Sequence, residues 1–136
     1  MNRSEFQILA IERLEDAGAL LKSGRYACAY YICGYAIECA LKACIAQRTR
    51  KGDFSPRNTQ MHYSHDLTRL LELADLSAAH KQEADTDSTF RQNWAIVKDW
   101  TEEARYRSIA PGQAGRMLAA VGDPDHGVLR WLRRNW

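Results

Sequence analysis

Hydrophobic residues recur along this chain at helical intervals, and no stretch of useful length shows the alternation of a β-strand. From Phe6 to Leu21 the apolar side chains are three or four residues apart, which predicts a helix capped by Ser4 and running to about Ser23. Gly24 follows, and glycine readily takes the left-handed conformation that ends a helix. Because the next helix begins at once, near Arg25, the two must pack antiparallel as a hairpin.

The second helix has almost no polar side. The segment Tyr26 to Ala46, YACAYYICGYAIECALKACIA, is interrupted only by Glu38 and Lys42. A helix without a polar face has to be surrounded by others, so we predict the central column of a helical bundle. The segment is near the length of about 20 residues that crosses a bilayer. Two charges well inside it would each cost about 2–3 kcal/mol there, so we do not expect a membrane span.

The rest of the chain predicts four further helices. Residues 47–63 contain Gly52, Pro56 and no periodicity, which indicates a long loop. The acid-rich stretch ADTDS, ending at Ser88, separates a third helix from a fourth. We expect a third helix at 65–74, capped by Ser64, with a broken continuation to 84. A fourth should run from about 89 to 107, with Lys98 and Glu102 paired on its flank. The last two should lie at 113–121 and after Asp123 and Pro124. The predicted fold class is all-α, an up-and-down helical bundle of four to six helices around a long central helix, in one domain of residues 1–136.

Composition limits the possible functions. Hydrophobic residues make up 46% and charged residues 26%, as in soluble globular domains, and a net charge of +2 is too small to attract a polyanion in bulk. Nucleic-acid binding would therefore need a local patch. Acidic residues near the start of the chain interrupt the apolar run that a secretory signal needs, so we expect a cytoplasmic protein. No histidine, cysteine and carboxylate set has metal-site spacing and no glycine loop fits a phosphate, so we expect neither metal nor cofactor.

The cysteines all lie on the central helix. They are five or six residues apart and form no C-x-x-C pair, and helical geometry keeps those that share a stripe out of disulfide reach. We expect buried, reduced thiols that pack as small hydrophobic groups. The four are Cys28, Cys33, Cys39 and Cys44.

The order of these features resembles the HEPN domain, a family of small prokaryotic α-bundles. The resemblance is carried by E-x-x-x-K at Glu38 and Lys42, by the His-Asp-Leu at 65–67 and by the Arg-Tyr at 105–106, and it covers almost the whole chain. It implies a bundle of four or five helices that is often a homodimer. Several members pair with a small nucleotidyltransferase-like protein in toxin-antitoxin systems, and others are metal-independent ribonucleases.

The resemblance also implies one candidate catalytic pair. Catalytic members carry an arginine and, after four to six residues, a histidine, often with Asn or Asp directly after the arginine. The two flank the scissile phosphate, where a cation and a proton-transfer group are needed. This chain has one match, Arg57 and His62, with Asn58 in second place. The match lies in the loop before the third helix, whereas catalytic members carry the motif toward the C-terminal helices.

A second candidate site lies at the end of the predicted fourth helix, at Arg105, Tyr106 and Arg107. Positive charge there suits the negative end of a helix. Alternatively the arginines contact phosphate while Tyr106 stacks on a base, as in single-stranded RNA binding. Glu38 and Lys42 either form a structural ion pair or line a cleft with Tyr35 and Arg105, in which Glu38 would hold the arginine.

Two other polar groups have structural interpretations beside functional ones. His65 and Asp66 are interpreted as capping and packing residues. The closing helix combines three arginines with two tryptophans, an arrangement that binds nucleic acid or docks a helix or a partner chain. These residues are Arg130, Trp131, Arg133, Arg134 and Trp136.

The sequence leaves three hypotheses open. The first is a binding module, a homodimer that holds RNA or nucleotide near Arg105 or pairs with a nucleotidyltransferase-like protein. The second is a ribonuclease that uses Arg57 and His62, and the third is an accessory bundle without a ligand. Small residues of the central helix permit close approach, either in the core or between subunits; they are Ala27, Ala29, Gly34 and Ala36.

Overall fold

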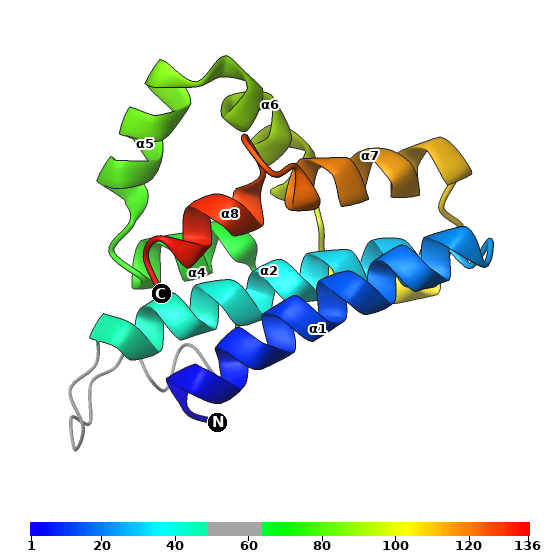
Figure 1. Cartoon of the computed structure of the whole chain (residues 1–136), viewed down its shortest axis with the longest axis horizontal. Helices are drawn as coiled ribbons and strands as arrows, with labels where there is room; N and C mark the ends of the chain where they lie inside the picture. Colours follow the sequence, from blue (N-terminus) through cyan, green and yellow to red (C-terminus); the bar gives the residue numbers. More distant parts are fainter. Residues whose placement is uncertain (49–63) are drawn as a thin grey trace.

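A computed structural model of the protein describes residues 1–48 and 64–136. This part of the chain forms seven α-helices, one 3₁₀ helix and no β-strand, which confirms the all-α prediction (Figure 1). The elements are α1 (Arg3–Lys22), α2 (Tyr26–Arg48), α4 (Leu67–Leu73), α5 (Ser77–Thr86), α6 (Ser88–Val97), η1 (Glu102–Tyr106), α7 (Pro111–Gly122) and α8 (Val128–Arg133).

Helices α1 and α2 form the predicted antiparallel hairpin. Gly24 joins them with a φ of 75°, in the left-handed region that glycine favours. The cap of α1 is Asn2 and not Ser4, because the Asn2 side chain accepts the amide of Glu5 while the Glu5 carboxylate accepts the amide of Asn2. Such a reciprocal capping box satisfies two amides that would otherwise have no partner.

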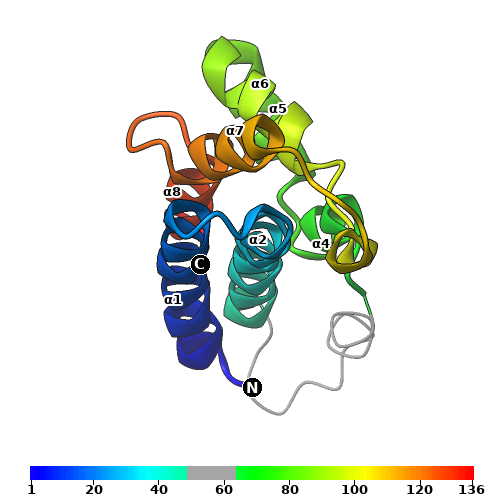
Figure 2. The same ribbon diagram turned by 90° about the vertical axis from the view of Figure 1, so that its right-hand side faces the viewer.

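The central column is confirmed over the C-terminal half of α2. Every residue from Ala36 to Ile45 is buried, the two charged ones included. Helix α2 contacts α1, α4, α7, α8 and η1, and Figure 2 shows it enclosed by them. It is long and apolar enough to cross a membrane, but 78% of its most apolar window is buried inside the fold, as in the core helix of a soluble protein.

The N-terminal half of α2 is more open, and this divides the cysteines. All four are free. Burial raises the pKa of Cys33 and Cys44 to about 12 and that of Cys39 to about 11, so these thiols stay protonated. Cys28 is exposed, so the prediction of a buried thiol was wrong at this position.

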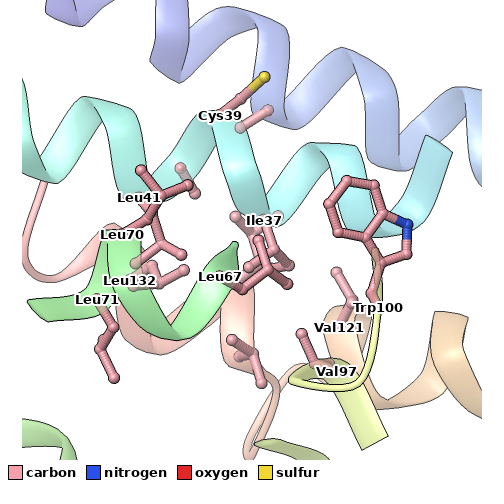
Figure 3. Close-up of a cluster of buried hydrophobic side chains, with 14 of the residues drawn as sticks. Ile37, Cys39, Leu41, Leu67, Leu70, Leu71, Val97, Trp100, Val121 and Leu132 are labelled. Atoms are coloured by element: carbon pink, nitrogen blue, oxygen red, sulfur yellow. The ribbon is translucent and has the colours of Figure 1, made fainter. Parts of the chain in front are cut away.

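The predicted fourth helix is broken. Helix α6 ends at Val97, and the chain turns inward at Trp100 before η1 begins. The indole of Trp100 lies against α2 at Gly34, where a Cβ would come within 2.2 Å of the ring (Figure 3). Trp100 is 2% exposed, and burying its ring is worth more than the helical hydrogen bonds lost at the break. Gly34 therefore permits a close approach within the core.

Helix boundaries differ from the predictions at three further places. Helix α4 starts at Leu67, because Asp66 rather than Ser64 accepts the capping amide, from Arg69. Helix α7 starts at Pro111, two residues earlier than predicted. Asp123 caps a turn instead of a helix, since its Oδ1 accepts the amides of residues 125 and 126, and α8 begins only after that turn.

Helix α5 stands away from the central hairpin beside α6 (Figures 1 and 2). None of its residues is buried. One of its contacts with the bundle is the half-buried ring of His80, whose centroid lies 4.8–5.6 Å from those of Phe90, Trp94 and Trp131. Burial lowers the pKa of His80, so the imidazole packs there as a neutral ring.

A histidine ties the α7–α8 turn to the start of α6. His126 Nδ1 lies 2.7 Å from Asp87 Oδ2, while Asp87 Oδ1 accepts the amide of Phe90 and caps α6. The hydrogen bond with Asp87 raises the pKa of His126, and the same bond lowers the pKa of Asp87. Asn93 donates a second bond across this junction, to the carbonyl of His126.

The first test concerns the notch at Gly34. Replacing Gly34 with Ala forces a methyl group into the indole of Trp100, and we expect a net loss of about 1–3 kcal/mol in the free energy of unfolding. Gly18→Ala in α1 is the matched control, since a Cβ there meets no atom within 4 Å and the better helix former should stabilise by about 0.5–1 kcal/mol. Urea denaturation measures both, and equal effects of the two substitutions would contradict this packing.

The second test concerns the His126 tie. Because the folded pKa of His126 is raised, its contribution to stability is complete below its ordinary pKa of 6.5 and is lost as the pH rises through the raised value. The lowered pKa of Asp87 makes its contribution complete above 3.8 and lost as the pH falls through the lowered value. The wild type should therefore be more stable than His126→Gln, and the difference in free energy of unfolding should be largest between pH 3.8 and pH 6.5. A difference that stayed constant from about pH 5 to about pH 9 would contradict the tie.

Candidate functional site

The η1 turn presents two of the predicted site residues together. Ala104 is buried, and Arg105, Tyr106 and Arg107 are exposed around it. Tyr106 is 78% exposed, and the guanidinium carbon of Arg105 lies 4.8 Å from the centroid of its ring. A planar cation over an aromatic face is held by the ring's quadrupole. Arg105 and Tyr106 thus form a stacked pair at the surface.

This pair continues onto α2 through Tyr31. Electrostatic interaction and hydrogen bonding with the phenol of Tyr106, and to a lesser degree with that of Tyr31, raise the pKa of Arg105. The ring of Tyr31 lies parallel to that of Tyr35, 6.5 Å away, and 5.9 Å from that of Trp100. The sequence interpretation missed Tyr31, although it lies four residues before Tyr35 and so on the same side of the helix.

Tyr35, on α2 beside Tyr31, and Arg107, directly after η1, are the other two residues predicted for this site. Burial, with smaller contributions from Cys39 and Glu38, raises the pKa of Tyr35 to about 12, so the phenol keeps its proton and can donate a hydrogen bond. Arg107 lies 3.8 Å from the carboxylate of Glu103, both side chains being exposed. We call Tyr31, Tyr35, Arg105, Tyr106 and Arg107 the η1 surface.

Glu38 and Lys42 form the predicted ion pair beneath this surface. Lys42 Nζ lies 3.0 Å from Glu38 Oε2, and both side chains are less than a tenth exposed. The other oxygen of Glu38 is bonded to His65 Nδ1 at 2.9 Å. Among the described residues, the partners of Glu38 are thus a lysine and a histidine, and the guanidinium of Arg105 lies over the ring of Tyr106 instead.

His65 connects three elements. Its Nε2 lies 3.1 Å from the carboxylate of Glu102, the first residue of η1, while Nδ1 is bonded to α2. The capping interpretation is right for Asp66, which caps α4. The bridge at His65 could not be predicted, because its two partners lie in distant segments of the chain. The predicted pair of Lys98 with Glu102 is replaced by this bond, since the helix that would have joined them is broken.

A hollow of about 440 Å³ opens beside His65. Its lining is mixed in charge, with carboxylates outnumbering cations, so it is unsuited to a phosphate group. The lining residues are Ser64, His65, Asp66, Lys98, Trp100, Thr101, Glu102 and Glu103.

The other predicted residues lie elsewhere. Arg57 and His62 fall outside the described residues. Helix α8 lies across α2 from η1 (Figure 2). Arg130 of α8 donates to the carbonyl of Asp125, and Arg134, directly after α8, pairs with Glu83. Within residues 1–48 and 64–136, no group of three or more His, Cys, Asp or Glu side chains is arranged to hold a metal ion.

Comparison with protein families gives one match. The model of the HEPN domain matches residues 9–123 of the 136, a span that contains most of α1 and all of α2, His65, η1 and α7. Comparison with curated proteins and with solved structures finds no match.

The third test addresses the buried ion pair. Lys42→Met removes one partner and leaves the Glu38 carboxylate buried with His65 alone, which should cost about 3–5 kcal/mol in the free energy of unfolding. Glu38→Leu combined with Lys42→Met should cost less than the sum of the single changes, because no buried charge remains unpaired. Denaturant unfolding of the wild type, Lys42→Met, Glu38→Leu and the double variant measures the coupling free energy, and strictly additive effects of the two substitutions would contradict the ion pair.

Proposed function

The chain belongs to the HEPN domain family, and on that premise we propose that it is a cytoplasmic binding module that holds RNA or a nucleotide on the η1 surface. Arginine supplies the cation for a phosphate, and the tyrosine ring supplies a face on which a base stacks. Both groups are in place on one short turn.

The observation that carries this proposal is the exposure of Tyr106 under Arg105. Of the residues in η1 only Ala104 is buried, so folding gains little from placing a large aromatic ring at 78% exposure. The guanidinium stacked 4.8 Å above it restricts both side chains before a ligand arrives. A preformed cation and aromatic pair is suited to a phosphate with its neighbouring base.

Local charge limits the ligand to a short one. Residues 98–107 contain Lys98, Arg105 and Arg107 beside Asp99, Glu102 and Glu103, so the segment is neutral. A long duplex needs many phosphate contacts. We therefore favour a mononucleotide or a few nucleotides of single-stranded RNA. Glu38 and Lys42 support the surface from within, since both are buried and bonded to each other.

We also propose a protein partner, either a second copy of the chain or a nucleotidyltransferase-like protein in a toxin-antitoxin pair. Family membership supports this proposal. A hollow of about 410 Å³ between α1 and α2, lined in part by Leu20, Cys28 and Ile32, supports association of two hairpins. Three of the four small residues of α2 add nothing to that argument, because Ala29 and Ala36 are buried and Trp100 covers Gly34; Ala27 is half-buried.

The fourth test measures binding by fluorescence anisotropy of a short labelled single-stranded RNA and of a labelled adenine nucleotide, at fixed salt. Tyr106→Ala should weaken the binding of at least one probe by about 5- to 150-fold, the equivalent of about 1–3 kcal/mol for one base stack. Arg105→Ala with Arg107→Ala should weaken it further and reduce its salt dependence.

The control is Lys81→Ala with Arg91→Ala, which removes two exposed positive charges from α5 and α6. This variant should bind like the wild type. Equal affinities of all the variants would contradict binding at the η1 surface.

Incubating the same RNA with wild type and His62→Ala in the presence of a chelator tests the ribonuclease hypothesis. Light scattering of the same samples gives the oligomeric state.

A further inference from the structure

We propose that His65 is a positioning residue of the η1 surface. By joining Glu38 of α2 to Glu102 of η1, it holds the turn that carries Arg105 and Tyr106 against the central helix. The inference deepens the proposed function and rests on it for the identity of the ligand. Its structural part can be measured without any ligand.

The η1 turn is too short to fix its own position. It has five residues, no side-chain cap at its N-terminus and one buried residue, Ala104. Backbone bonds join it to the residues on either side, from the Ala104 amide to the Thr101 carbonyl at 3.0 Å and from the Arg107 amide to the Ala104 carbonyl at 3.1 Å. Short 3₁₀ helices have weak hydrogen-bond geometry, so contacts with other elements must place this one.

Two such contacts lie at the start of the turn. Trp100 fills the notch at Gly34, which fixes where the chain meets α2. Glu102, two residues later, is held by His65 at 3.1 Å. The indole fixes a point along the helix, and the carboxylate fixes how the turn is rotated about that point. Since Arg105 follows Glu102 by three residues, rotation of η1 moves its guanidinium away from Tyr31.

The opposite end of the bridge is rigid. Glu38 is 2% exposed in the part of α2, Ala36 to Ile45, where every residue is buried, and Lys42 holds its Oε2, so that Oε1 is presented to His65 in one position. On the other side Asp66 caps α4 and thereby fixes the backbone next to His65. An imidazole has nitrogens on opposite sides of one ring and can bond two separate carboxylates at once.

Amide substitutions can separate the two bonds of His65. The amide of asparagine lies close to the position of Nδ1, and the longer glutamine brings its amide toward Nε2. His65→Asn should keep the bond to Glu38 and lose the bond to Glu102, and Glu102→Ala should lose the same bond from the other side. His65→Gln should retain the bond to Glu102 and rescue in part.

The test is amide hydrogen exchange of wild type, His65→Asn, Glu102→Ala, the double variant and His65→Gln, together with the anisotropy assay above. Exchange in residues 98–107 should rise on the order of tenfold in His65→Asn and in Glu102→Ala, with no further rise in the double variant. Ligand affinity should fall about fivefold in both and recover in part in His65→Gln. Glu72→Ala, which breaks an exposed ion pair with Arg69 on α4, is the control and should change neither readout.

The outcomes separate this inference from the proposed function. Unchanged exchange in residues 98–107 of both single variants would overturn the positioning role, whatever the ligand does. Exchange that rose equally across α2 and α4 would make His65 a general structural residue and would overturn it as well. If exchange rose only in residues 98–107 while the wild type bound no probe, the positioning role of His65 would stand and the proposed function would fail.

Discussion

A carboxylate buried in the middle of an otherwise apolar helix is the constraint around which this fold is organised. An isolated charge in that position would be too costly, so Glu38 needs partners that the core itself cannot supply. One comes from the next turn of the same helix, as Lys42, and the other from the start of α4, as His65. Because His65 also bonds Glu102, it connects the buried carboxylate to η1, which carries the exposed residues of the proposed site.

A second constraint acts beside the first and has the opposite chemistry. At Gly34 the central helix lacks a side chain, and the indole of Trp100 occupies that space. An apolar anchor and a charged anchor therefore hold one short turn at adjacent points. This combination explains why a turn with little internal structure can present Arg105 and Tyr106 as a stacked pair. The HEPN family scaffold supplies the hairpin, and the local contacts make the surface.

The pattern of apolar residues was sufficient to predict the hairpin and the class of fold, because the burial of α1 follows the helical repeat and the long α2, which lacks a polar face, had to be surrounded by other helices. It failed at η1 because Phe90, Val97 and Ala104 keep helical spacing across the break and all three are buried. By contrast, Arg105 and Tyr106 could be chosen as candidate residues for binding a phosphate and a base from their residue types alone. Tyr31 and His65 could not, since their importance depends on contacts between segments far apart in the sequence. Nothing local distinguishes Asn2 from Ser4 as a cap either.

Because α2 is less buried in its N-terminal half, the protein has one exposed cysteine that can carry a spectroscopic label. Three of its cysteine sulfur atoms lie in the core with strongly raised pKa values, whereas Cys28 is exposed near Gly24, where the two helices of the hairpin join. A maleimide dye or nitroxide would therefore modify the unmutated chain at a single position. That position borders the hollow between α1 and α2, so its signal would report directly on whether two hairpins meet there.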